Sequence, residues 1–286
     1  MKLKKRYALT GVSFTLPFLA GFALLYLVPF RWSTQKTFTA GAGGIRFAGL
    51  QNYADLFRSA AFRLAAGNTF RFIAVGVPLL MALSFLLALA LYRKFRGASF
   101  FRSAFLMPMV IPVAATITVV RAFFGDSGLT NQLLELLGLP IQDFMGSELA
   151  FPVLVGLYIW KNCGYNIVLF LAGLSAIPTD YADAARCDGA TPGHILRRIT
   201  LPLMIPNFFF VFVISVVNAF KSFREAFLLG GDRPHESIYM LQHFMNNNFQ
   251  NINYPRLSTA ALLIFVVIFL LVLLLFWVKR KHEVAL

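Results

Sequence analysis

The sequence predicts an all-α membrane protein with six transmembrane helices, and three observations lead to this fold class. Of the 286 residues, 58% are apolar and only 13% are charged, whereas a soluble domain averages about half apolar and a quarter charged. The apolar residues lie in long runs of roughly 20, the length that an α-helix needs to cross the hydrocarbon core. Segments rich in lysine and arginine alternate with poor ones, as in chains that cross a membrane repeatedly.

Six apolar segments each predict one spanning helix. They cover residues 9–30, 69–92, 103–124, 151–175, 203–220 and 259–278. In a bilayer every backbone polar group has to be satisfied within the chain. We therefore expect residues 1–286 to form a single transmembrane domain, built as a bundle of helices.

The first apolar run follows a basic start, Lys2 to Arg6, as a signal peptide does. A signal peptide, however, has an apolar core of about 7–15 residues, and this run is about 22 residues long. The length favours an uncleaved anchor.

The distribution of basic residues predicts the orientation. Fourteen of the 26 lysines and arginines lie in segments 1–8, 93–102, 176–200 and 279–286, and nine lie in the longer segments 31–68, 125–150 and 221–258. Basic residues collect on the cytoplasmic side of a membrane protein. Both termini are therefore expected in the cytoplasm. The same rule accounts for the net charge of +14 without nucleic acid, and we predict no nucleic-acid binding.

Two further features follow from residue placement. Cys163 lies inside a predicted span and Cys187 in a polar loop, so no disulfide is expected between them.

Residues 128–138 carry leucines at helical spacing and end on Gly138. This pattern predicts a short amphipathic helix on or near the outer surface.

The polar segment 177–202 carries many helix signals for a connection between two spans. Asp180 is placed to cap a first short helix, with Asp183 in its first turn. Gly189 then allows a sharp turn. The segment is thus expected to start with a helix and a tight stop.

A second short helix is predicted directly afterwards. Thr191 is a suitable N-cap, with Pro192 at the favoured first position. Arg197 and Arg198 fall in the last turn, and Leu201-Pro202 is expected to end the helix. Two helices joined by a tight turn would make a rigid, cytoplasmic projection.

The segment contains Asp183-Ala184-Ala185, then Asp188-Gly189-Ala190, and later Ile199-Thr200-Leu201-Pro202. This series resembles the EAA loop of the permease subunits of binding-protein-dependent ABC importers, with Asp183 where the family usually has Glu. The resemblance implies a six-helix permease bundle of type I. It also implies that the loop docks into an ATPase subunit through Asp183, Ala184, Ala185, Asp188, Gly189, Ala190, Ile199, Leu201 and Pro202.

What the resemblance implies extends to partners and location. The chain would pair with a second homologous permease, as a heterodimer, and with two ABC ATPase subunits that carry ATP and Mg. An extracytoplasmic binding protein would deliver the solute. The assembly would lie in the cytoplasmic membrane of a bacterium or archaeon, and this chain would be a transport subunit without catalytic residues, a metal or a cofactor of its own.

Other segments resemble the carbohydrate-transporting members of that family. They are Phe223…Phe227…Gly230-Gly231 and Leu257–Ala261, whereas Asn68-Thr69 and Leu171–Pro178 resemble the importer family in general. The family's Gly-Gly-Pro is interrupted here by Asp232-Arg233. The resemblance implies a mono- or oligosaccharide as the solute, with glycerol phosphate or another polyol derivative as the alternative.

A path for a sugar needs hydrogen-bonding groups beside aromatic rings. Polar residues within spans usually face the interior of the bundle, although bonding between helices explains them equally well. The predicted contacts with the substrate are Asn162, Tyr165, Asn166, Asn218 and Ser222, beside Lys161.

Two other classes of protein are disfavoured. Ion-coupled transporters commonly place acids or histidines within the membrane, and all twelve acids and four histidines lie outside the predicted spans. The nucleotide-binding loop GxxxxGK[ST] and the hydrolase motifs HExxH and GxSxG are absent from the sequence.

Overall fold

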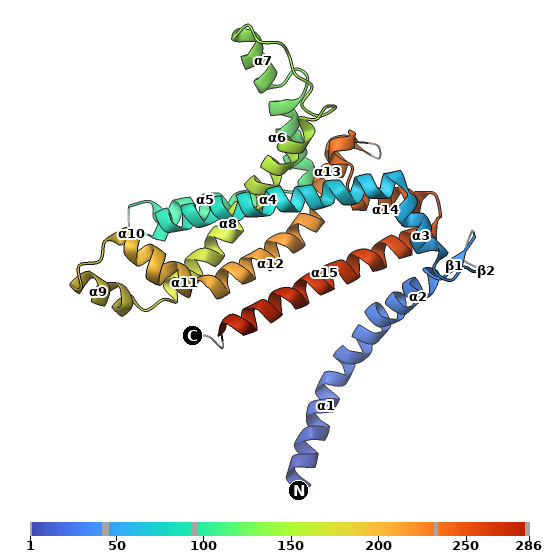
Figure 1. Ribbon diagram of the computed structural model, residues 1–286, viewed down its shortest axis with the longest axis horizontal. Helices are drawn as coiled ribbons and strands as arrows, with labels where there is room; N and C mark the ends of the chain where they lie inside the picture. Colours follow the sequence, from blue (N-terminus) through green and yellow to red (C-terminus); the bar gives the residue numbers. More distant parts are fainter. Residues whose placement is uncertain (1, 42–45, 93–95, 232–233, 284–286) are drawn as a thin grey trace. The chain divides into compact units, whose positions relative to one another are not determined.

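The computed structural model describes residues 2–41, 46–92, 96–231 and 234–283, and over these ranges the regular structure is almost entirely helical (Figure 1). Five helical runs are long and apolar enough to span a bilayer, and a bent pair of helices supplies a sixth. These five runs are Gly11–Lys36, Ala60–Tyr92, Ala150–Ser175, Ile205–Gly230 and Tyr254–Leu274. The prediction of a six-span, all-α fold is confirmed.

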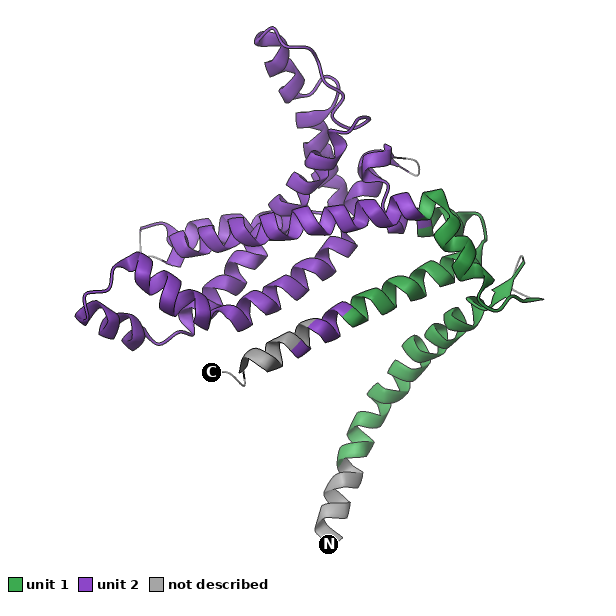
Figure 2. Ribbon diagram, viewed as in Figure 1, with its two compact units in different colours: residues 1–62, 245–270 green, residues 63–244, 271–286 purple. Residues whose placement is uncertain are grey.

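Contacts within the chain define two compact units (Figure 2). The first comprises residues 1–62 and 245–270, and the second comprises residues 63–244 and 271–286. The expectation of a single transmembrane domain stays a prediction. Each unit is described separately below.

The first unit contains one long helical run followed by a small hairpin. The run passes from α1 (Lys2–Phe22) through a π-helical turn, η1 (Ala23–Leu27), into α2 (Val28–Lys36). Strands β1 (Thr39–Ala40) and β2 (Arg46–Phe47) pair antiparallel, and α3 (Gln51–Arg58) follows. Asn52 ties α3 to the hairpin, because its Nδ2 donates to the carbonyl oxygens of Thr37 and Thr39 at 2.8 and 2.7 Å.

The second unit holds most of the remaining elements. They are α4 (Ala60–Tyr92), α5 (Ala98–Val110), α6 (Val113–Phe124), α7 (Leu129–Leu136), α8 (Ala150–Ser175), α9 (Thr179–Cys187), α10 (Pro192–Ile195), η2 (Leu196–Thr200), α11 (Leu201–Leu203), α12 (Ile205–Lys221), α13 (Phe223–Gly230), η3 (Glu236–Ile238) and the start of α14 (Leu241–Gln250). The last helix, α15 (Tyr254–Glu283), is divided between the two units.

The core of the second unit is formed by α4, α8 and α12. Phe85, Phe170 and Phe208, one from each helix, have ring centroids 4.7–5.3 Å apart. Such tilted ring pairs add about 0.5–1.5 kcal/mol each to the burial of their area. Helices α8 and α12 are the two that flank the polar segment 177–202, so the core fixes the base of that segment.

The segment predicted as one span over residues 103–124 is two helices, α5 and α6, and the run Val113–Leu136 that begins with α6 is bent by 101° from α5. The break falls at Ile111, which is extended at φ −63° and ψ 127°. A residue before proline avoids the helical region, because the ring of Pro112 crowds its backbone. Pro112 also lacks the N–H that would continue the helix, so the chain turns and α6 starts anew at Val113.

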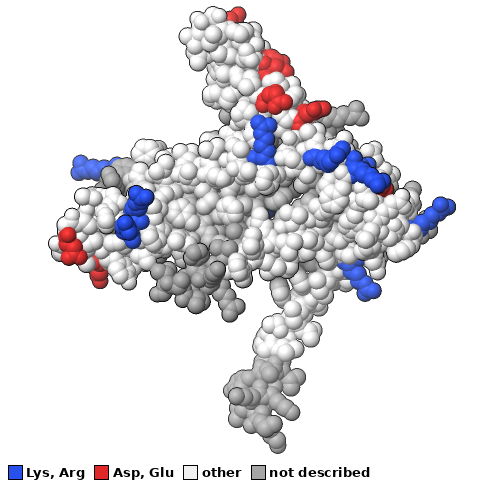
Figure 3. All heavy atoms as spheres, viewed as in Figure 1, with Lys and Arg blue, Asp and Glu red and all other residues white. Residues whose placement is uncertain are grey.

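The short helix predicted within residues 128–138 is present as α7. It ends on Gly138, whose φ is +69°, and the N–H of Leu139 donates to the carbonyl of Leu134 at 2.8 Å. This bond across a left-handed glycine is a Schellman stop. Within the second unit, α6 and α7 project as an arm (Figure 1) that carries acidic side chains (Figure 3). Its placement at the outer surface stays a prediction.

Candidate functional site

The segment between α8 and α12 forms the helix-turn-helix projection that its residues predict. Helix α9 ends in a second Schellman stop: Gly189 has φ +78°, and Ala190 N donates to Ala185 O at 2.9 Å. Only glycine takes up this conformation without strain. The stop places α9 and α10 at the end of the second unit that lies opposite α13 (Figure 1).

Two local details differ from the prediction. The N-cap of α9 is Pro178 rather than Asp180, and it makes no side-chain capping bond. Asp180 lies inside the first turn instead, where its charge still faces the positive end of the helix dipole. Thr191 and Pro192 take the predicted N-cap and first positions of α10.

The projection does not end at Leu201-Pro202 as expected. Residues Leu196–Thr200 form a π-helical turn, after which α11 carries the chain past Pro202 and into α12. A wider turn brings a proline in without the clash that a regular helix would impose. As a result α10 continues almost directly into the membrane helix, and Ile195 and Met204 are buried at the junction.

Helix α9 has no buried residue among those that the structure describes. Asp183, Ala184 and Asp188 are exposed, whereas Ala185 and Ala190 are half-buried. Asp183 forms an ion pair with Arg186 at 2.5 Å, one turn along the same helix. Exposed pairs of this kind contribute little stability, so the carboxylate stays available to a partner. Ile199, Leu201 and Pro202 are half-buried at the base.

The polar side chains predicted for the path fall into two groups along α8 and α12. In the first group, Asn166 is fully buried and its Nδ2 donates to Ser215 Oγ at 2.8 Å. Tyr158 donates its hydroxyl to the carbonyl oxygen of Ser215 at 2.7 Å. Both contacts join α8 to α12, so Asn166 acts at least in part as a link between helices.

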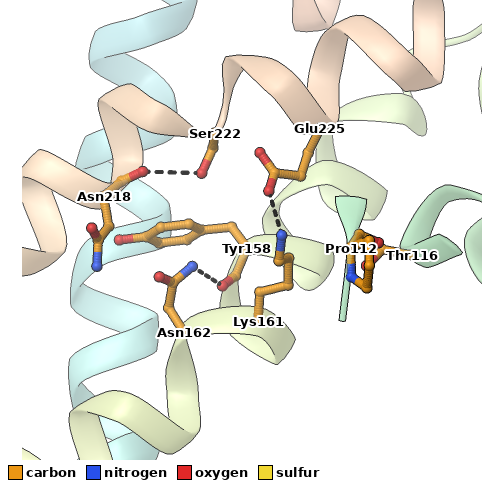
Figure 4. A network of polar contacts seen from close by, with 8 residues as sticks. All are labelled: Pro112, Thr116, Tyr158, Lys161, Asn162, Asn218, Ser222 and Glu225. Carbon is orange, nitrogen blue, oxygen red and sulfur yellow. Dashed lines mark hydrogen bonds and ion pairs between the residues drawn. The ribbon is translucent and has the colours of Figure 1, made fainter. Parts of the chain in front are cut away.

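The second group lies around Lys161 and Asn162, in the middle of α8 (Figure 4). Lys161 Nζ is 2.7 Å from Glu225 Oε1. Asn162 Nδ2 donates to the carbonyl of Tyr158 at 2.9 Å, and the buried Ser222 donates to the carbonyl of Asn218 at 3.2 Å. Asn218 itself is half-buried on α12. Tyr165 is the one of the five predicted path residues that belongs to neither group; it is half-buried on α8.

Sequence reasoning missed Glu225 as a residue of a span. The fifth predicted span stopped at Phe220, whereas the apolar helical run continues to Gly230. The statement that all acids lie outside the spans is therefore wrong for Glu225. A charged Arg224-Glu225 pair after a polar Lys221-Ser222 reads as a loop, and only the packing shows that Glu225 is 9% exposed.

The second unit also carries two apolar hollows on either side of Gly156 and Trp160, with volumes of about 410 and 570 Å³. One is lined by α6 and α8, the other by α4, α5 and α8. Their walls offer almost no hydrogen-bonding groups, so they do not suit a sugar.

Comparison with known proteins shows the family to which the chain belongs. Residues 74–283 match the family described as "Binding-protein-dependent transport system inner membrane component". The chain belongs to this family. It is therefore a multi-pass inner membrane component of a transport system, and both the α9–α10 projection and the polar groups on α8 and α12 lie within the matched residues.

Individual relatives match the chain over three quarters of its length or more. The chain is 29% identical to the probable ABC transporter permease protein YesP of Bacillus subtilis, over 96% of this chain and 93% of that protein. It is 32% identical to the arabinooligosaccharides transport system permease protein AraP of the same species, over 76% and 70%. It is 28% identical to the trehalose/maltose permease protein MalF of Thermococcus litoralis, over 93% and 92%.

A solved structure shares the fold. A chain of a bacterial ABC transporter that is involved in the import of the acidic polysaccharide alginate superposes with a TM-score of 0.86. The match covers 98% of this chain and 97% of that one at 22% identity. The chain thus has the fold of an ABC importer permease.

Proposed function

We propose that the chain is the membrane-spanning subunit of an ATP-driven importer that translocates a carbohydrate. Membership of the binding-protein-dependent family carries the proposal. The named relatives AraP, MalF and the lactose permease protein LacF of Rhizobium radiobacter support a mono- or oligosaccharide as the solute. The amide and hydroxyl groups on α8 and α12 suit the hydroxyls of such a solute.

The importer would be assembled from several chains. A second, homologous permease would complete the path, and a separate binding protein would deliver the sugar. Two ATPase subunits would hold ATP and Mg, because this sequence lacks a phosphate-binding loop of its own. A related solved structure contains an alginate transporter together with a periplasmic protein that carries an alginate pentasaccharide, which supports this mode of delivery.

The α9–α10 projection would dock on an ATPase subunit. Its exposed Ala184 and the stop at Gly189 permit a close contact, and Asp183 offers a charge. A contact that differs between two states of the ATPase pair is what couples hydrolysis to movement of the helices. The π-helical junction into α12 would carry that movement into the membrane.

A second solute class has one specific observation in its favour. That class is glycerol phosphate or another polyol derivative. The chain is 28% identical to the sn-glycerol-3-phosphate transport system permease protein UgpA of Agrobacterium fabrum, over 82% of both chains. An ion-driven transporter has weaker support, because Glu225, the only acid within the five single-run candidate spans of the described residues, is paired with Lys161.

The docking role is tested by two matched glycine substitutions. Gly189 and Gly138 have nearly the same φ, +78° and +69°, and both end a helix with a Schellman stop. Valine at either site costs the same kind of backbone strain, about 1–2 kcal/mol. We expect Gly189→Val to lower co-purification of the ATPase subunit and sugar uptake at least about tenfold, and Gly138→Val to leave both near the parent level.

Normal uptake in Gly189→Val would refute the docking role. Uptake that is driven by an ion gradient without ATP hydrolysis would refute the importer itself. Uptake of glycerol phosphate in preference to sugars, measured with the native binding protein, would select the alternative solute.

A further inference from the structure

The Lys161–Glu225 ion pair stands out because it places two charges in an apolar setting. The side chains are 13% and 11% exposed and their charged atoms are 2.7 Å apart. Glu225 is the only acid in the five single-run candidate spans of the described residues, the bent pair of α5 and α6 set aside. The pair joins α8 to α13, and its two residues are 64 positions apart in the sequence.

Stability alone is a weak reason for such a pair. Removing two charges from water costs nearly as much as their attraction returns, and well-packed apolar residues often do as well. Breaking the pair on one side is costly, however, because a buried charge is left alone. The pair is therefore suited to holding one specific arrangement of two elements.

The element held by Glu225 is short and follows a break in the helix. α12 ends at Lys221 and α13 begins at Phe223, with Ser222 outside both. On α13, Ala226 and Leu229 are buried. Arg121 Nη2 of α6 also contacts the carbonyl of Leu228, at 3.4 Å. Besides the ion pair, the described contacts of α13 include a ring contact between Phe227 and His243, apolar packing and this long bond. Ser222 bonds within its own helical run, to the carbonyl of Asn218, so it marks the place where α13 would pivot if the ion pair were lost.

The two long helices beside α13 are braced along their length. Nearest the α9–α10 projection, Asn207 Nδ2 donates to the carbonyl of Leu169 at 3.1 Å. Farther along, Asn166 is bonded to Ser215 at 2.8 Å. Lys161 is 14 residues, or about 21 Å, from the end of α8 at Ser175. Tyr158 lies three residues farther along α8 but bonds back to Ser215 at 2.7 Å. Along α12 and α13, the partner of Lys161 is therefore the most remote from the projection of these braces between described residues.

We propose that Lys161 and Glu225 are a positioning pair, which fixes α13 to α8 so that α8, α12 and α13 move as one body with the α9–α10 projection. The proposal rests on the proposed function, in which an ATPase moves that projection. The pair would then carry the displacement across the break at Ser222. Without it, the projection and the nearer parts of α8 and α12 would move while α13 lagged behind.

The test measures whether α13 follows the projection. Cys187, which is exposed on α9, and a cysteine introduced by Leu228→Cys on α13 receive nitroxide labels, whereas Cys163 is buried. The distance distribution between the labels is recorded in the complete importer before and after trapping with ATP and vanadate. In the parent protein we expect the same narrow distribution in both states.

Charge reversals provide the decisive comparison. Lys161→Glu and Glu225→Lys should each broaden or shift the distribution after trapping, and the double variant Lys161→Glu/Glu225→Lys should restore it. A purely structural role would not give a change confined to the trapped state. Arg224→Gln is the matched control, since it removes an exposed charge beside Glu225, and we expect the parent distribution. Should a reversal fail to fold, Glu225→Gln removes the charge more gently and should show the same trend.

Parent-like distributions in both single reversals, or a double variant no better than the singles, would overturn the positioning role. The proposed function fails in a separate way: an importer in which the parent chain traps no nucleotide with vanadate would contradict it, and the positioning role would fall with it.

Discussion

Gly164 sets the distance between α5 and α8. A Cβ atom built at this position would overlap the carbonyl oxygen of Phe105, so the two backbones touch here. Small residues permit this approach between membrane helices. We expect Gly164→Ala to destabilise the chain by about 1–3 kcal/mol, the usual cost of overpacking, measured as thermal unfolding of the purified protein in detergent.

Gly156 on the same helix is the control. A Cβ there meets no atom within 4 Å, and alanine is the better helix former by about 1 kcal/mol. Gly156→Ala is therefore expected to leave the stability unchanged or to raise it slightly. Equal destabilisation by both substitutions would contradict the close-contact role of Gly164.

At the scale of residues, local signals were predictable and partners were not. The stop at Gly189 follows from the sequence because a glycine after a helical pattern has one dominant use. The partner of Lys161 does not, because Glu225 follows it by 64 residues and lies in a stretch with the polarity of a loop. Asn166 was singled out from the sequence, but its partner Ser215 was missed for the same reason: a serine in an apolar run gives no hint of what it bonds.

At the scale of elements, the arm formed by α6 and α7 depends on one buried side chain. Asn131 is 2% exposed, and its Nδ2 lies within 2.9–3.3 Å of the carbonyls of Gly125, Asp126 and Gln142, while its Oδ1 accepts from Gln142 N at 3.0 Å. Asn131→Ala leaves these backbone groups unpaired, at a cost of about 2–4 kcal/mol. We expect faster limited proteolysis within residues 125–149.

The neighbouring Gln132 provides the comparison, because its side chain is exposed and bonds only Ser127 O among the described residues. Gln132→Ala should be cleaved at close to the parent rate. If Asn131→Ala is cleaved no faster than Gln132→Ala, the arm is held by other contacts.

Helices were predicted well where the length of an apolar run sets their bounds, and poorly where a proline bends or continues the helix. Long runs such as α8 and α15 follow from hydropathy alone. The bend at Ile111 was missed because the apolar run 103–124 reads as continuous, and the effect of Pro112 on its neighbour depends on whether packing tolerates a kink. Pro202 misled in the opposite sense, since the π-helical turn carries the helix through it.

At the scale of the whole molecule, the predicted orientation can be tested with the natural cysteines. Cys187 is exposed on α9 and Cys163 is buried. If the α9–α10 projection is cytoplasmic, a membrane-impermeant maleimide should label inverted membrane vesicles but not intact cells or spheroplasts. Cys187→Ser should abolish the labelling, and labelling from the outside would reverse the orientation.

The ion pair between α8 and α13 also constrains how this chain can change over evolutionary time. Replacing either partner alone leaves a buried charge uncompensated, at a cost of several kcal/mol. An exchange of the two charges is therefore expected to pass through uncharged intermediates, or not to occur at all. Positions 161 and 225 should consequently vary together among close descendants, even though the residues around them on α13, such as the exposed Leu228, remain free to drift alone.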